Sequence, residues 1–232
     1  MDRRVLLLHA AALLLASPAA AQEEGYDYVA SSPQPGAAQQ RSAQPVIGLR
    51  QRADFLVVQV SLTSDSRDAT VRKTEIHTML LDALAKAPGA NIELATGAPV
   101  LTALTRENYQ TVNLTWAGRE DTSKTDIMIK VPLSASAAET ERRVDAFIAT
   151  LKRSGRGTIY KAGGRQLALR NPGQHREQIV RLIAADARAN AEIFGPDYRA
   201  FVDGIDRQVQ WTQVSDTEVF LYLPYTYRIG AR

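Results

Sequence analysis

The apolar positions of residues 55–62, "FLVVQVSL", lie on both faces of an extended chain. The two faces carry Phe55 and Val57 on one side, and Leu56, Val58, Val60 and Leu62 on the other. A strand that is apolar on both faces is typical of the interior of a sheet. We therefore expect the ordered part of the chain to open with a central strand.

Three further segments repeat their apolar residues with helical spacing, which predicts amphipathic helices near 67–87, after Ser136 and near 174–194. The first stripe is Ile76, Met79, Leu80, Ala83, Leu84 and Ala87, and the second is Val144, Phe147, Ile148 and Leu151. Ser136 and Glu139 have the spacing of a capping box at the start of the second helix. In the third helix, Glu177 and Arg181 have the i, i+4 spacing of a surface ion pair.

The remaining apolar segments predict strands. We expect a short strand at 91–96 and a hairpin that joins 109–118 to 124–133. A second hairpin is expected at 157–171, with its turn at Gly163-Gly164. Two strands, at about 199–213 and 217–229, are expected to close the chain.

The last predicted strand alternates more regularly than the others. Its odd positions form one apolar face, made of Val219, Leu221, Leu223, Tyr225, Tyr227 and Ile229. We expect this face to lie in the core, and the mixed face with Phe220 and Tyr222 to meet solvent or a partner. Pro224 lacks an amide hydrogen, so it belongs at a sheet edge or a bulge.

These elements predict an α+β fold, with antiparallel or mixed sheets and about three amphipathic helices packed on them. The order of strand, helix and further strands occurs twice, with helices near 67–87 and 174–194. The pattern is therefore compatible with two similar β-α-β-β halves.

The N-terminal segment has the pattern of a signal peptide over residues 1–21, with a basic start, an apolar run and small residues before cleavage near Ala21/Gln22. The apolar run has about 12 residues, fewer than the ~20 needed to cross a bilayer. Residues 22–45 are rich in Pro, Gln and Ala and are expected to form a disordered tail. We therefore predict an exported periplasmic protein with one domain at 46–232, not an integral membrane protein.

Charge and cysteine content exclude several classes of function. The net charge of +3 is too balanced to favour nucleic acid as a partner. The chain has no cysteine, so disulfides, a cysteine nucleophile and thiolate metal sites are excluded. We expect no cofactor.

No arrangement of residues in the sequence predicts a catalytic or metal site. His77 has no ligand-type residue one helical turn away, and His175 and Glu177 do not share a face. Trp116 and Trp211 lie near strand ends, where packing against the core is the first expectation for an aromatic residue. An exposed pair would instead form a contact surface for a partner or a sugar, and Phe220 and Tyr222 are the other candidates for such a surface.

Two segments resemble SIMPL-domain proteins. The segment 179–195, "IVRLIAADARANAEIFG", is similar to the C-terminal helix of that family at Ala184, Ala185, Asp186, Ala187, Arg188 and Ala191. The segment 52–73, "RADFLVVQVSLTSDSRDATVRK", resembles the family's first strand and the start of its first helix. The resemblance implies an exported α+β protein of the bacterial periplasm or outer envelope. It also implies self-association and a link to envelope or oxidative stress, without an established enzymatic activity.

Two hypotheses about function follow. The first is a protein that acts by contacts, through self-association and a possible envelope protein partner. The alternative is a small periplasmic hydrolase or ligand-binding enzyme, which would need groups such as His77, His175 or Asp186 to meet in a pocket.

Overall fold

The computed structural model describes residues 27–29 and 47–231. The predicted signal peptide, residues 1–21, and most of the predicted tail, residues 22–45, lie outside the described residues. Within that tail, Asp27–Val29 forms strand β1, so the prediction of disorder is wrong for these three residues. They are held by pairing with two other strands, partners that the composition of the tail could not reveal.

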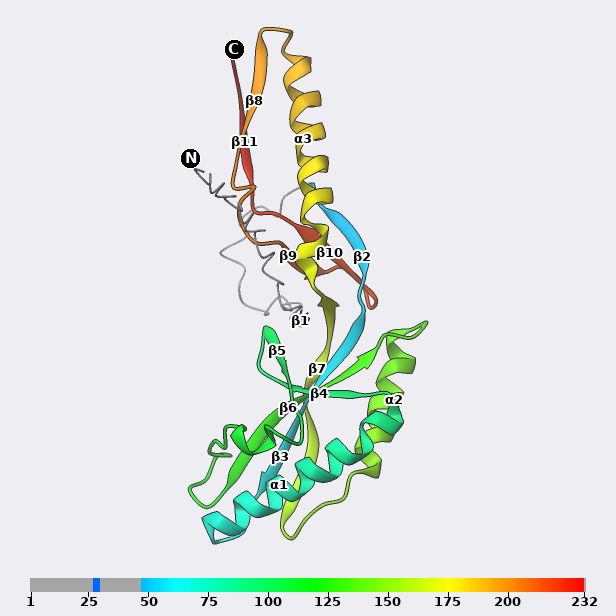
Figure 1. Ribbon diagram of the computed structural model, residues 1–232, viewed down its shortest axis with the longest axis vertical. Coiled ribbons are helices and arrows are strands. Elements are labelled where there is room, and N and C mark those ends of the chain that lie inside the picture. The colour runs from blue at the N-terminus through cyan, green and yellow to red at the C-terminus, as the bar shows by residue number, and fades with distance from the viewer. Residues whose placement is uncertain (1–26, 30–46, 232) are drawn as a thin grey trace, which may run out of the picture.

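The molecule is elongated and has two parts joined by long strands (Figure 1). One part is a closed ring of antiparallel strands that pair in the order β1-β5-β4-β6-β3-β7, with β7 returning to β1. Its other strands are β3 (Phe55–Ser64), β4 (Glu93–Thr96), β5 (Val100–Ala103), β6 (Ser123–Pro132) and β7 (Gly157–Arg170). The central position predicted for residues 55–62 is confirmed, because β3 lies between β6 and β7.

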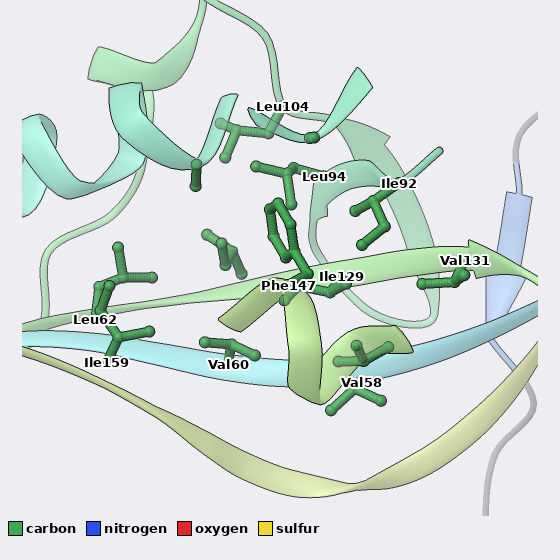
Figure 2. Close-up of a cluster of buried hydrophobic side chains, with 14 of the residues drawn as sticks. Val58, Val60, Leu62, Ile92, Leu94, Leu104, Ile129, Val131, Phe147 and Ile159 are labelled. Carbon is green, nitrogen blue, oxygen red and sulfur yellow. The ribbon is translucent and has the colours of Figure 1, made fainter. Parts of the chain in front are cut away.

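Helices α1 (Ala69–Lys86) and α2 (Ala137–Thr150) cover the outside of this ring. Figure 2 shows Val58, Val60 and Leu62 of β3 packed with Ile129 of β6 and Phe147 of α2. The predicted stripe of the first helix supplies the facing side chains, with Ile76, Met79, Leu80 and Ala83 fully buried. The opposite face of β3 points into the ring, where Phe55 and Val57 pack with Leu101 and Met128.

Side-chain caps fix the starts of both helices. The Asp68 carboxylate accepts hydrogen bonds from the amides of Thr70 and Val71, at 2.8 and 2.9 Å. The hydroxyl of Ser136 accepts a bond of 3.1 Å from the amide of Glu139, as the capping box predicted. These bonds satisfy amides that have no partner inside a helix.

The second part contains a three-stranded antiparallel sheet, a two-stranded sheet and one helix. The strands are β2 (Leu49–Arg52), β10 (Glu218–Tyr222) and β9 (Gln210–Gln213), in that order, and the pair β8 (Tyr198–Asp203) and β11 (Thr226–Ala231). Helix α3 (Arg176–Ile193) follows a short 3-10 turn, Pro172–His175. A second apolar cluster joins Ile179 and Ile183 of α3 to Val219 and Leu221 of β10 and to Leu167 at the end of β7.

The predicted α+β class is confirmed, with antiparallel sheets and three α-helices among the described residues. The repeat of two similar halves stays a prediction. None of the helices in the described part of the chain is long and apolar enough to span a membrane.

The hairpin predicted for 109–118 and 124–133 is wrong. Tyr109–Thr111 forms a 3-10 turn, and only Thr115 pairs with Lys124 in an isolated bridge. The side chain of Asn108 accepts a bond from the amide of Thr105 and donates one to the carbonyl of Ala103. Such local bonds offer the backbone an alternative to a strand.

The hairpin predicted at Gly163-Gly164 is also wrong, because β7 continues through both glycines. The register against β3 shifts there, from Arg165 opposite Val58 to Lys161 opposite Val60. The glycines therefore form a bulge in β7, where one strand has extra residues and bends.

The two closing strands of the prediction are four strands in the structure. Gly204, with φ of +88°, follows β8, and Pro224 separates β10 from β11 because it cannot donate a hydrogen bond. Val219, Leu221 and Leu223 are buried as predicted. Tyr225, Tyr227 and Ile229 are not buried, since the chain beyond Pro224 enters the separate two-stranded sheet.

Candidate contact surfaces

The aromatic pair Phe220 and Tyr222 lies on the outer face of β10. The two rings stack with centroids 6.0 Å apart and an interplanar angle of 24°, and both side chains are half-buried. The neighbouring Val219 and Leu221 are fully buried, so the predicted division between the two faces of this strand is confirmed. Burial raises the pKa of the Tyr222 hydroxyl above its usual value.

The absence of a side chain at Gly48 leaves room for the Phe220 ring. A Cβ at Gly48 would lie 2.4 Å from Phe220 Cζ and 2.3 Å from the carbonyl oxygen of Leu221. The ring therefore rests across the backbone just before β2, beside Arg50, which is the register partner of Phe220 and is exposed. This surface combines two aromatic rings with a nearby positive charge.

Trp211 does not belong to that surface. Its register partner in β10 is Leu221, and residues directly opposite in an antiparallel pair share a face. Trp211 accordingly packs against the buried cluster around Ile179 and Leu221. The packing expected first for this residue therefore agrees with its partly buried position against the cluster.

Trp116 is separate from both. It lies in the segment that precedes β6 in the ring part of the molecule, and 62% of it is exposed. The four aromatic residues singled out from the sequence therefore do not form one surface: Phe220 and Tyr222 are together, Trp116 is apart from them, and Trp211 is partly buried against the apolar cluster.

A larger exposed apolar region lies on what we call the arm, made of α3, β8 and β11. At its end, Ile193 is 79% exposed, Phe194 60% and Tyr198 42%. The rings of Phe194 and Tyr198 have centroids 6.1 Å apart. We call these three residues the tip.

The strands of the arm are only partly covered. No residue of β8 or β11 is fully buried, and within the described residues these two strands pair only with each other. On one face, the guanidinium groups of Arg199 and Arg228 lie 4.6 and 4.2 Å from the ring centroid of Phe201. Helix α3 runs beside β8, whereas no described strand pairs with the outer edge of β11, which is open to pairing with another chain.

His77, His175 and Asp186 do not meet. His77 lies on α1 with its ring edge-on to Tyr109, at 5.3 Å between centroids. Its Nε2 atom is buried without a hydrogen-bond partner among the described residues. Burial and the charge of Lys73 lower the pKa of His77. His175 and Asp186 are eleven residues apart along α3, or ~16 Å at 1.5 Å per residue.

Neither of these histidines nor Asp186 lines any of three surface pockets that described residues form. The first, of about 430 Å³, is lined mainly by threonines and asparagines, with Asp126. The second, of about 210 Å³, is largely aliphatic and contains Lys130. The third, of about 270 Å³, contains Asp65, Arg119 and Arg156. Across residues 27–29 and 47–231, no cluster of three or more His, Asp or Glu side chains could hold a metal ion.

Comparisons with known proteins give no match among family models, curated proteins or solved structures. The resemblance to SIMPL-domain proteins therefore stays a prediction from the quoted segments.

The sequence contains a signal for the exposure of Ile193 but none for the burial of Lys130. The buried positions of α3 are Ile179, Ile183, Ala187 and Ala191, spaced four apart. Ile193 falls off that stripe, and this was the available signal that it is exposed. Phe194 continues the spacing of the stripe, and it is exposed because the helix ends at Ile193. Lys130 gave no such signal, because its partner Asp27 lies 103 residues away in the sequence.

Proposed function

We propose that this chain is an exported, SIMPL-like protein of the bacterial envelope that acts through protein contacts and assembles with copies of itself. Its role would lie in tolerance of envelope or oxidative stress, as the family resemblance implies. The proposal requires a surface that gains stability when a second chain covers it.

The observation that carries the proposal is the arm. Among the described residues, no strand pairs with the outer edge of β11, and unpaired strand edges favour pairing with further chains. The tip adds Ile193, Phe194 and Tyr198, which are exposed in the single chain. Aromatic residues on a protruding surface are typical anchors of an interface. Together these features support association through the arm.

The test compares two substitutions at equally exposed aromatic residues. Phe194 and Trp116 are 60% and 62% exposed, but only Phe194 belongs to the arm. Light scattering behind a sizing column would measure the native mass of residues 22–232 carrying Phe194→Ser or Trp116→Ser. We expect Phe194→Ser to raise the dissociation constant by at least about tenfold, and Trp116→Ser to leave it unchanged. Equal effects of the two substitutions would contradict the assignment to the arm.

The alternative, a small periplasmic hydrolase or ligand-binding enzyme, has less support. General acid-base or nucleophilic catalysis needs its groups within hydrogen-bond reach of one another or of a bound substrate. The candidate groups His77, His175 and Asp186 lie in none of the three pockets. Contact through the arm therefore has the stronger physical argument.

A further inference from the structure

Lys130 is a buried cation at one mouth of the strand ring. Only 5% of the residue is exposed, and its ammonium group lies 4.1 Å from the centroid of the Phe55 ring. Its ion-pair partners are Asp27 of β1 and Glu93 of β4, the latter at 2.6 Å. A buried charge that loses a partner is strongly destabilising. Lys130 therefore favours a carboxylate at the position of Asp27.

A second cation lies beside the same position. The guanidinium of Arg170, at the end of β7, is 5.0 Å from the Phe55 ring centroid. Arg170 is also the register partner of Asp27. The Phe55 ring thus has two cations near it, and Asp27 of β1 supplies an anion that pairs with Lys130 and lies opposite Arg170 in the sheet. This arrangement selects an acidic residue at the first position of β1.

Strand β1 fills a slot between β5 and β7. Two of its residues pair with β5 and three with β7, and this pairing closes the ring. Without β1, the facing edges of β5 and β7 would lack that partner. The slot is therefore a site to which an extended segment can add. Main-chain hydrogen bonds provide the affinity, and the cations beside the Asp27 position provide the specificity.

The chain that carries β1 is longer than the path to its own slot requires. Val29 and Phe55 are both register partners of Ala168, so they lie on either side of β7, ~10 Å apart at the usual strand spacing. Ile47 is only eight residues before Phe55. The 17 residues between Val29 and Ile47 can span up to roughly 55–60 Å. That length is enough for β1 to reach the same slot in an adjacent copy.

We propose that in the assembled protein Asp27–Val29 of one copy occupies the slot between β5 and β7 of a neighbouring copy. Such an exchange costs no contacts, because every pairing and ion pair within one chain is reproduced between two chains. It links copies through the ring part of the molecule, in addition to the arm. The inference rests on the proposed self-association and specifies one interface within it.

Mixed single-cysteine variants test the exchange directly, because the natural chain has no cysteine. Tyr28 and Val100 are register partners. Residues 22–232 carrying Tyr28→Cys would be mixed with a mass-tagged chain carrying Val100→Cys, under mild oxidation. We expect a disulfide between the two different chains, seen on a non-reducing gel and by mass spectrometry. The chain with both substitutions should also form 28–100 links between copies.

A matched pair controls for random collision. Thr63 of β3 and Thr158 of β7 are register partners on two neighbouring strands of the ring, and neither belongs to β1. Mixed Thr63→Cys and Thr158→Cys chains should not cross-link, whereas the chain with both should form an internal disulfide. Adding Asp27→Asn to the Tyr28→Cys chain should lower the yield between chains by about tenfold or more, because a buried charged hydrogen bond is lost.

The outcomes separate this inference from the proposed function. If the protein is an oligomer but the 28–100 disulfide forms only within chains, the exchange is wrong and self-association stands. If the protein is monomeric and the disulfide is internal, both are wrong. If no 28–100 disulfide forms in either arrangement, the docking of β1 in this slot is overturned.

Discussion

Gly155 lies directly against the carboxylate of Glu75. A Cβ on Gly155 would be 1.9 Å from Glu75 Oε1, and the backbone φ of Gly155 is +51°. The next amide, that of Arg156, donates a hydrogen bond of 3.2 Å to the same oxygen. The hydroxyls of Ser64 and Ser66 also donate to this carboxylate. Glu75 therefore joins α1, the end of β3 and the segment before β7.

Gly155→Ala should destabilise the protein by about 2–4 kcal/mol, because it combines a positive φ with a clash against a buried carboxylate. Gly118→Ala is the control: its φ is +98°, but nothing lies within 4 Å of its Cβ position. Urea unfolding would measure both. If Gly155→Ala lowers the free energy of unfolding no more than Gly118→Ala does, the contact with Glu75 does not contribute to the effect.

Glu75→Gln should change how stability depends on pH. Burial by itself raises the pKa of Glu75, but hydrogen bonds from Ser64, Ser66 and the Arg156 amide outweigh it, and the pKa lies below its usual range. The carboxylate therefore contributes stability above the unfolded pKa of about 4.3, and this is lost as pH falls through the folded pKa. We expect Glu75→Gln to cost about 1.5–3 kcal/mol at pH 7 and progressively less towards pH 3. A difference from the natural chain that stays constant with pH would refute this account.

His77→Phe should reduce the pH dependence between pH 7 and 5. Burial, with the charge of Lys73, lowers the pKa of His77, so the unfolded chain binds a proton at a higher pH than the folded chain. The free energy of unfolding therefore has its full value above the unfolded pKa of about 6.5. It decreases as the pH falls towards the folded pKa, because the unfolded chain then binds a proton that the folded chain does not. Thermal unfolding at several pH values would show a flatter slope for His77→Phe. An unchanged slope would mean that burial of this ring does not oppose protonation.

Gly48→Ala should weaken the packing of β2 on β10. The new methyl group would meet the Leu221 carbonyl at 2.3 Å and the Phe220 ring at 2.4 Å. The ring can turn away, but the carbonyl is part of the strand, so we expect a loss of about 1–3 kcal/mol. Near-ultraviolet circular dichroism should change as Phe220 and Tyr222 separate. Gly89→Ala, with nothing within 4 Å, should stay within about 0.5 kcal/mol of the natural chain.

Strongly periodic segments were predictable because burial fixes their side chains. Leu56 to Leu62 and the stripe from Ile76 to Ala83 lie in one core, and each alternative register would expose them. Gly163-Gly164 was ambiguous, since a pair of glycines is compatible with a turn and with a bulge. The pairing partner decided it: β3 pairs with β7 on both sides of the two glycines. That pairing joins residues about a hundred positions apart.

The contact residues were less predictable for a related reason. Trp211 and Phe220 look alike in the sequence, as aromatic residues in predicted strands. The register of β9 against β10 places Trp211 opposite Leu221 and Phe220 opposite Thr212, which puts their side chains on opposite faces. Register depends on the geometry between strands, and the alternation within one strand does not set it.

The most direct test of self-association is the mass of the natural chain, residues 22–232, in sedimentation equilibrium over a wide range of concentrations. The account predicts a discrete multiple of the protomer mass that dissociates only on dilution. A monomer at every concentration would contradict it, because the unpaired edge of β11 and the exposed tip would then not be covered by a second copy of the chain.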